Sequence, residues 1–327
     1  MLRNEFEKKD GYYLFTISLS AILLISLLTA LLSQSLNIHD DEGNFKEPWF
    51  WIISAVLQLS LFACVFVYTK INKIDYLKAT RIKSKINFST LILAVVLGVG
   101  VFCTVNPIQL WILQALSKIG YTVTSSVPID NGILNTVLLI LVVVVLPAFC
   151  EEQLFRGVIT NGLSKKGLIN ACLISGALFM IYHVNPAQTV HQFIMGVLLA
   201  YIALKSMSII PGMLIHLINN LIVVIVAKTT EEGAGDAFIL KYWYIFLFGG
   251  LIITSLALYA FIQKTKHIKI EKQDTDQPVT VQKVLTLDSV RNKSNTKKSV
   301  SEIMVLAAGI AICVLFWLSN FVSGLSK

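Results

Sequence analysis

Long apolar runs, separated by short polar segments, follow one another along the whole chain. A run of about 20 residues is long enough to cross a hydrocarbon layer roughly 30 Å thick as a helix. The runs are continuously apolar, whereas the strands of a transmembrane barrel alternate apolar and polar positions. Helices are predicted over residues 13–33, 49–69, 88–113, 133–163, 168–184, 189–205, 208–227, 242–263 and 303–324. The pattern therefore predicts an all-α fold, a polytopic transmembrane helical bundle with about eight or nine membrane helices.

The composition excludes a water-soluble globular fold. Of the 327 residues, 55% are hydrophobic and 14% are charged, whereas soluble domains carry about 25% charged residues. The five cysteines fall within apolar runs without CxxC spacing, so we interpret them as buried apolar side chains rather than metal ligands. The sequence contains no phosphate-binding loop and no dinucleotide-binding fingerprint.

The net charge of +8 is distributed in a way that predicts the orientation in the membrane. The segment after the first run is acidic, with Asp40, Asp41 and Glu42, whereas residues 70–85 are rich in lysine and arginine. Because basic loops remain in the cytoplasm, we expect a cytoplasmic N-terminus and a basic cytoplasmic loop over residues 264–299. Cations that lie in loops between membrane helices indicate topology, so no nucleic acid is expected as a partner.

The fourth run carries the most abrupt polar segment of the chain. It is apolar up to Cys150 and continues with Glu151 and Glu152, with Arg156 one helical turn later. An ionisable side chain at bilayer depth costs at least about 2.5–3.5 kcal/mol, so the few that occur usually face an interior cavity and have a function. The alternative is that the helix ends at Cys150 and that the carboxylates mark its cytoplasmic boundary.

Two further runs bring histidines to a comparable depth. His183 lies near the end of the fifth run, and His216 lies in the seventh. With a rise of about 1.5 Å per residue, Glu152 lies roughly 17 Å from the cytoplasmic end of its helix, His183 roughly 22 Å and Asn220 roughly 18 Å. Glu152 and Arg156 are four residues apart, as are His216 and Asn220, so each pair shares one helix face.

These side chains are suited to hydrolysis of a peptide or amide bond. A glutamate next to a histidine can take a proton from water. Arg156 can neutralise one of the two carboxylates through charge-assisted hydrogen bonds and leave the other to respond to its neighbours. The remaining histidine and an asparagine amide can donate hydrogen bonds to the oxyanion that forms when water attacks a carbonyl.

The motifs Glu-Glu-x-x-x-Arg, Phe-x-x-x-His and His-x-x-x-Asn, in this order on successive apolar helices, resemble those of the CPBP family. That family joins the type II CAAX prenyl endopeptidases to bacterial Abi-like intramembrane proteases. The resemblance covers residues 133–227 and implies a catalytic helical core there. Residues 1–132, with three spans, and residues 228–327, with the C-terminal spans and the basic loop, lie outside it.

The resemblance implies a role for each motif residue. Glu151 with His183 would activate the attacking water, His216 with Asn220 would form the oxyanion pocket, Glu152 and Arg156 would brace the site, and Phe179 would be a packing residue. The resemblance leaves the use of a metal open. A zinc site made from His183, His216 and Glu151 is one alternative, and a metal-free mechanism through the same residues, which we favour, is the other. The usual metalloprotease signature, His-Glu-x-x-His, is absent.

We expect an endopeptidase that acts on a hydrophobic peptide or membrane-protein substrate within the bilayer. The short loops favour a bacterial member of the family, in the cell membrane. Two other hypotheses remain open at this point: a non-catalytic membrane scaffold of the same fold that binds an envelope protein, and a proton-coupled transporter. A transporter usually shows two related halves with interrupted helices, and the hydropathy shows no such symmetry.

Overall fold

The computed structural model describes residues 2–39, 45–123, 127–128, 132–230, 233–266 and 288–325. Within these ranges the secondary structure is helical, apart from two isolated bridges. The helices before the fourth span are α1 (Lys8–Leu36), α2 (Glu47–Ile71), α3 (Tyr76–Ala79) and α4 (Phe88–Lys118). Those after it are α8 (Leu168–Tyr182), α9 (Thr189–Ser206), α10 (Ile210–Thr229), α11 (Ala234–Lys241), α12 (Trp243–Thr265) and α13 (Asp288–Leu325).

The predicted helical membrane bundle is confirmed. Each of the nine predicted helices is present in the described part of the chain, and eight of them are long and apolar enough to cross a membrane. The remaining one, α8, has only 15 residues. The short helices α3 and α11 were not predicted, because a single turn or two in a connecting segment leaves no apolar run.

The predicted loop over residues 264–299 is wrong at both ends. The helix α12 continues to Thr265, and α13 already begins at Asp288. The polar composition of residues 288–299 hid this, because hydropathy detects only the part of a helix that lies in the apolar layer. Residues 267–287 lie outside the described residues.

The fourth span continues past the carboxylates, so the alternative that it ends at Cys150 is wrong. It consists of α5 (Ile133–Leu139), a π-helical segment (Ile140–Val145), α6 (Leu146–Glu152), a second π-helical segment (Gln153–Thr160), α7 (Asn161–Leu163) and a last 3₁₀ turn (Ser164–Lys166). The residues from Cys150 to Leu163 are all buried. Wider π turns inside α-helices frequently mark functional sites. This span therefore runs through the interior of the bundle with its polar residues covered by other helices.

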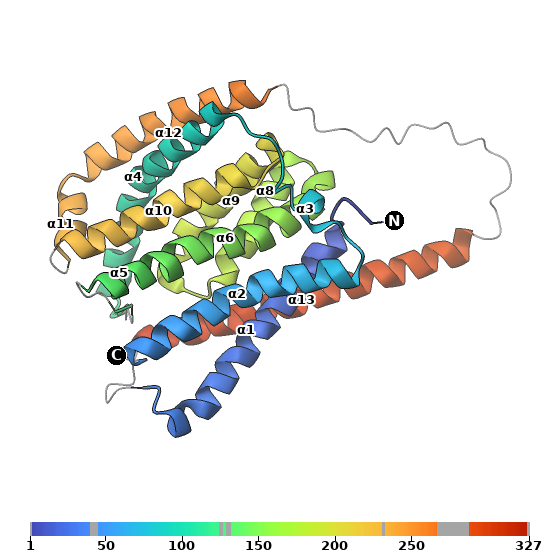
Figure 1. Ribbon diagram of the computed structural model, residues 1–327, viewed down its shortest axis with the longest axis horizontal. Coiled ribbons are helices and arrows are strands. Elements are labelled where there is room, and N and C mark those ends of the chain that lie inside the picture. Colours follow the sequence, from blue (N-terminus) through green and yellow to red (C-terminus); the bar gives the residue numbers. More distant parts are fainter. Residues whose placement is uncertain are drawn as a thin grey trace.

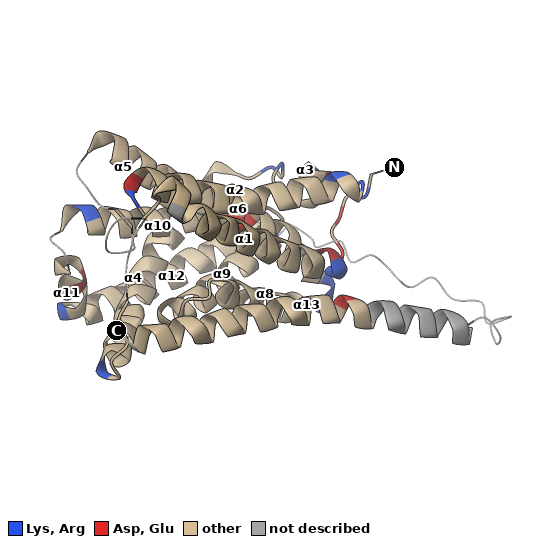
Figure 2. Ribbon diagram, turned by 90° about the horizontal axis from the view of Figure 1, so that it is seen from below, with Lys and Arg blue, Asp and Glu red and all other residues tan. Residues whose placement is uncertain are grey.

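The helices pack around this span in a bundle whose two chain ends lie at opposite ends of the molecule (Figure 1). The helix α4 lies between α10 and α12, α8 pairs with α9, and α13 packs on α1. Charged residues gather at the two ends of the bundle, and the carboxylates of α6 are an exception inside it (Figure 2). This separation is the one expected of a protein whose middle lies in a hydrocarbon layer.

Two glycines bring α8 and α9 into close contact beside the fourth span. A Cβ added to Gly196 would lie 2.7 Å from the Cα of Gly176, and one added to Gly176 would lie 2.5 Å from Val197 Cγ2. Only glycine allows two membrane helices to approach so closely. The contact fixes the end of α8, and the histidine that follows it, against the interior of the bundle.

Candidate active site

Glu151 and His183 face each other from two different helices. Glu151 lies on α6, and His183 directly follows the last residue of α8. The His183 Nε2 atom is 3.7 Å from Glu151 Oε2, and the side chains are 20% and 11% exposed. That distance is longer than a direct hydrogen bond. The two groups are therefore close enough to share a small molecule between them, and they retain limited access from outside.

The orientation of the His183 ring is fixed by a hydrogen bond at its other nitrogen, Nδ1. Nδ1 lies 2.8 Å from the backbone oxygen of Phe179, one helical turn earlier. A carbonyl oxygen only accepts hydrogen bonds, so Nδ1 carries the proton and donates it. In the neutral ring Nε2 is then a free acceptor, and it is this atom that faces Glu151.

The second carboxylate, Glu152, belongs to a tighter cluster. Its Oε1 atom accepts a hydrogen bond from Arg156 Nη1 at 2.8 Å and lies 3.1 Å from His216 Nδ1. The side chains of Glu152 and Arg156 are both fully buried. A second guanidinium nitrogen of Arg156 donates to the backbone oxygen of Gly196 on α9 at 3.5 Å. This cluster joins the fourth span to α9 and α10 and pairs a buried carboxylate with a buried cation.

The ring of Phe179 lies between the two clusters. Its centroid is 4.5 Å from that of His183 and 6.2 Å from that of His216. The guanidinium carbon of Arg156 lies 4.3 Å from the same centroid, over the ring face, where a cation is attracted by the π-system. Phe179 thus packs against three of the polar side chains, His183, His216 and Arg156.

Asn220 shares a face of α10 with His216 but is not joined to it. Its amide nitrogen donates to the backbone oxygen of Val143 in the fourth span, at 3.3 Å, and its amide oxygen accepts from Asn219 at 3.4 Å. His216 instead pairs with Glu152. Of the residues singled out from the sequence, the structure therefore joins Glu151 to His183 and Glu152 to Arg156 and His216, and leaves Asn220 one turn away.

The sequence interpretation missed two residues that touch the carboxylates. Gln58, on α2, donates from its amide nitrogen to Glu151 Oε1 at 3.1 Å. Gly212, on α10, lies so close to Glu152 that an added Cβ would be 3.1 Å from Oε2. An isolated glutamine in an apolar run was a signal for Gln58, since a polar amide in a membrane helix usually needs a partner. For Gly212 we find no comparable signal in the sequence.

Three acceptors of this site remain without a protein donor. Glu151 Oε2, Gln58 Oε1 and Glu152 Oε2 are buried, and none of them has a hydrogen-bond partner among the described residues. Buried polar atoms are nearly always satisfied by protein or water, so the side of Glu151 that faces His183 is the side that can bind an external donor.

The residues do not fit the zinc site that the sequence left open. Across the described ranges, no three His, Cys, Asp or Glu side chains come together as a group that could hold a metal ion. His183 lies beside Glu151, but His216 is directed to Glu152, which is already bound to Arg156. We therefore derive no step through a metal.

Comparison with known proteins identifies the segment that carries the site. Residues 133–222 match the sequence profile of a family described as type II CAAX prenyl endopeptidase Rce1-like. The matched segment begins at α5 and ends within α10, so it contains both carboxylates, both histidines and Asn220, but not Gln58. No curated protein and no solved structure matches the chain significantly.

Proposed function

We propose that the chain is an intramembrane endopeptidase in which Glu151 and His183 activate water, on the premise that residues 133–222 match the type II CAAX prenyl endopeptidase Rce1-like family. The family is a protease family, and the chain is an integral membrane protein with its carboxylates inside the bundle. The observation that carries the proposal is the approach of His183 Nε2 to Glu151 Oε2 at 3.7 Å, between side chains that are 20% and 11% exposed.

The attacking water binds between two acceptors. Neutral His183 presents a lone pair on Nε2, and the free Oε2 of Glu151 presents another, so one water can donate a hydrogen bond to each. As the water oxygen forms its bond to the scissile carbonyl carbon, one of its protons passes to this pair. The same proton is then available for the amine nitrogen that leaves when the C–N bond breaks.

The oxyanion of the tetrahedral intermediate is stabilised from α10. His216 Nδ1 faces a carboxylate and therefore carries a proton, so Nε2 donates to the oxyanion only when the ring is doubly protonated. Glu152 balances that positive charge, and Arg156 in turn balances Glu152. Asn220 donates the second hydrogen bond after its amide turns from Val143 to the substrate.

The substrate is a hydrophobic peptide or a membrane protein that reaches the site within the bilayer. Prenylated CAAX peptides, which the name of the matched family specifies, are one form of such a substrate. The cytoplasmic N-terminus and the bacterial cell membrane stay predictions from the loop charges and loop lengths.

The test is cleavage by the full-length protein in lipid nanodiscs. The probes are a set of fluorogenic hydrophobic peptides and a farnesylated CAAX peptide. We expect Glu151→Gln and His183→Ala to lower the rate by about 100-fold or more, because proton transfer in the transition state contributes roughly 10²–10⁴-fold. Glu302→Gln, in α13, is the matched control and should cleave like the unmodified protein.

In cells, membrane peptides that accumulate uncut in the Glu151→Gln strain identify the natural substrate. Equal membrane abundance of both forms is required for that comparison. Cleavage that persists in Glu151→Gln overturns the proposed role of this residue. A lost phenotype with no uncut species points instead to a scaffold or a transporter.

A further inference from the structure

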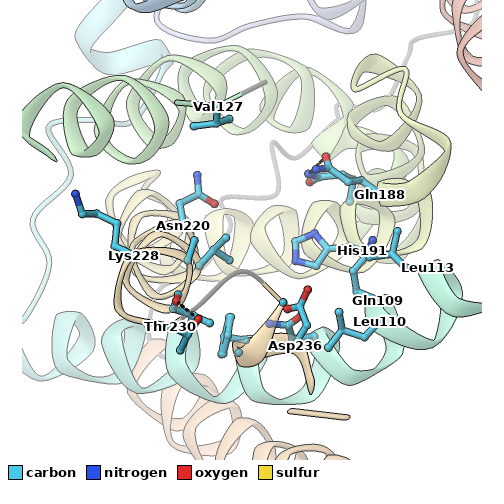
Figure 3. A pocket seen from close by; sticks show the side chains of 18 residues that line it. Gln109, Leu110, Leu113, Val127, Gln188, His191, Asn220, Lys228, Thr230 and Asp236 are labelled. Atoms are coloured by element: carbon cyan, nitrogen blue, oxygen red, sulfur yellow. Dashed lines mark hydrogen bonds between the residues drawn. The ribbon is translucent and has the colours of Figure 1, made fainter. Parts of the chain in front are cut away.

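A pocket of about 880 Å³ opens beside the candidate active site, between α4, the start of α9, α10 and α11 (Figure 3). The short helix α8 explains why it exists. Its 15 residues rise about 22 Å, less than the roughly 30 Å of the apolar layer. The turn into α9 therefore lies inside the bundle, and residues at the start of α9 border the pocket instead of the bundle surface.

Carboxamides make up most of the polar lining of the pocket. Five amide side chains line it, from three different helical regions: Asn106, Gln109, Gln188, Gln192 and Asn220. A carboxamide offers a donor and an acceptor side by side, as a peptide group does. Gln109 donates to the backbone oxygen of Ala187, and its own amide oxygen is buried without a partner among the described residues. The pocket is thus equipped to bind N–H and C=O groups.

The charges of the pocket favour an uncharged ligand. Three described residues of the lining have ionisable side chains: Lys228, Asp236 and His191. Lys228 and Asp236 are the two that are ordinarily charged at neutral pH. Lys228 already donates a hydrogen bond to Thr136. Partial burial raises the pKa of the Asp236 carboxyl. The described residues of the lining include no cluster of cations, so their chemistry does not match a phosphate or another anion.

Asn220 connects this pocket to the site of cleavage. It lines the pocket, and it lies one turn of α10 from His216, which is bound to Glu152. A substrate whose scissile carbonyl is held by His216 and Asn220 can therefore extend into the pocket on one side. The volume lies in the range of roughly 300–1,000 Å³ that is typical of ligand sites and has room for a short peptide segment.

We propose that the carboxamide-lined pocket is a substrate subsite that binds a short, polar, uncharged peptide segment next to the scissile bond. This inference rests on the proposed function. The substrate then has two unlike parts: a hydrophobic part in the bilayer and a segment rich in residues such as serine or asparagine in the pocket. The loop charges predict that the α11 end of the bundle, where the pocket opens, faces away from the cytoplasm.

The kinetic test uses fluorogenic peptides with a hydrophobic half and a Ser/Asn-rich half, synthesised in both orders. Asn106→Leu and Gln192→Leu remove one amide each, and Ala227→Trp fills the pocket. We expect each to raise KM about tenfold with kcat nearly unchanged, because the amide variants lose a hydrogen bond, which in a buried site changes binding by roughly this factor, and Ala227→Trp occupies the space of the bound segment. Gln114→Leu is the matched control, an exposed glutamine on α4 outside the pocket, and should leave both constants unchanged.

Peptides with lysine or aspartate in the polar half should bind about tenfold more weakly than those with serine, since Lys228 already donates to Thr136 and Asp236 is partly buried with a raised pKa. Unchanged KM in all pocket variants overturns the inference. So does a fall in kcat alone, which indicates that the pocket only admits water.

A binding measurement separates this inference from the proposed function. In the Glu151→Gln background, with the two partly exposed cysteines Cys64 and Cys103 replaced by serine, a maleimide labels a cysteine introduced by Gln192→Cys or, as control, by Gln114→Cys. The Ser/Asn peptide should protect the first site by at least about fivefold and leave the second unprotected, as expected for a saturating ligand. Protection without cleavage by the unmodified protein refutes the protease and keeps the peptide site. Cleavage without protection refutes the peptide site and keeps the protease.

Discussion

The two carboxylates of the candidate site are neighbours in sequence but lie in opposite kinds of surroundings. Glu152 is fully buried and held by Arg156 at 2.8 Å and His216 at 3.1 Å. Glu151 keeps 11% of its side chain exposed, and its histidine partner stands 3.7 Å away. One helix thus presents a paired acid and an available acid in consecutive positions.

The difference teaches how a membrane protein can keep a reactive carboxylate. A buried ion pair is costly to form and still more costly to break, so the Glu152 cluster serves to fix the relative position of three helices. Glu151 is positioned by one neutral donor, Gln58, on the oxygen that does not face His183. Its other oxygen stays free for water. We call Glu152 with Arg156 and His216 the paired half of the site, and Glu151 with His183 and Gln58 the open half. The paired half fixes the positions of the helices, and the open half contains the groups that react with water.

The largest effect should come from breaking the paired half. Arg156→Leu leaves Glu152 buried beside a histidine without its main cation, and removal of one partner of a buried pair destabilises a protein by roughly 3–5 kcal/mol. We expect a corresponding loss in the free energy of unfolding, measured by denaturant titration in detergent micelles. Glu151→Gln, which changes the open half, should alter that free energy by less than about 1 kcal/mol.

The double variant Glu152→Gln/Arg156→Leu provides the control for that prediction. It removes both charges, so it should recover most of the lost stability while remaining inactive. Equal destabilisation by the single and the double variant would show that the ion pair is not what holds the three helices.

Hydropathy and spacing were sufficient for the fold and for part of this cluster. The nine helices follow from apolar runs, and the contact between Glu152 and Arg156 follows from their spacing of four residues. The pairing of His216 with Glu152 was not predictable in the same way. The rise per residue predicts a depth of roughly 17 Å for Glu152 and roughly 12 Å for His216, yet their side chains touch, because tilt and rotation of whole helices decide such contacts.

The contact of Gln58 with Glu151 is a second one that could not be predicted from the sequence. Gln58 lies in a separate span, outside the segment matched by the family, and nothing in its local pattern names its partner. Only the packing of α2 on α6 brings its amide to Glu151. Contacts within one helix are encoded in spacing, whereas contacts between helices depend on the complete set of packing interactions.

A smaller effect should follow from changing the open half through Gln58. Gln58→Leu removes the donor on Glu151 Oε1 and leaves that oxygen free to turn toward His183. We expect kcat to fall about tenfold with KM nearly unchanged, since one hydrogen bond to a charged group contributes roughly 1.5 kcal/mol. The measurement is steady-state cleavage in nanodiscs, with Gln114→Leu as the control on an exposed face. Unchanged kcat would mean that Glu151 is oriented by the backbone of α6 alone.

The smallest effect should come from Gly212, which tests how rigid the paired half is. In Gly212→Ala the new Cβ lies about 3.1 Å from Glu152 Oε2, while alanine itself stabilises a helix over glycine by roughly 0.5–1 kcal/mol. These terms oppose each other, so the free energy of unfolding should change by less than about 1 kcal/mol. Cleavage should still fall a few-fold, because Glu152 moves and His216 moves with it. Gly249→Ala, whose Cβ meets no atom within 4 Å of the described structure, is the matched control and should only raise stability. Identical behaviour of the two alanine variants would show that the Glu152 carboxylate shifts freely and that the paired half is less rigid than its short contacts indicate.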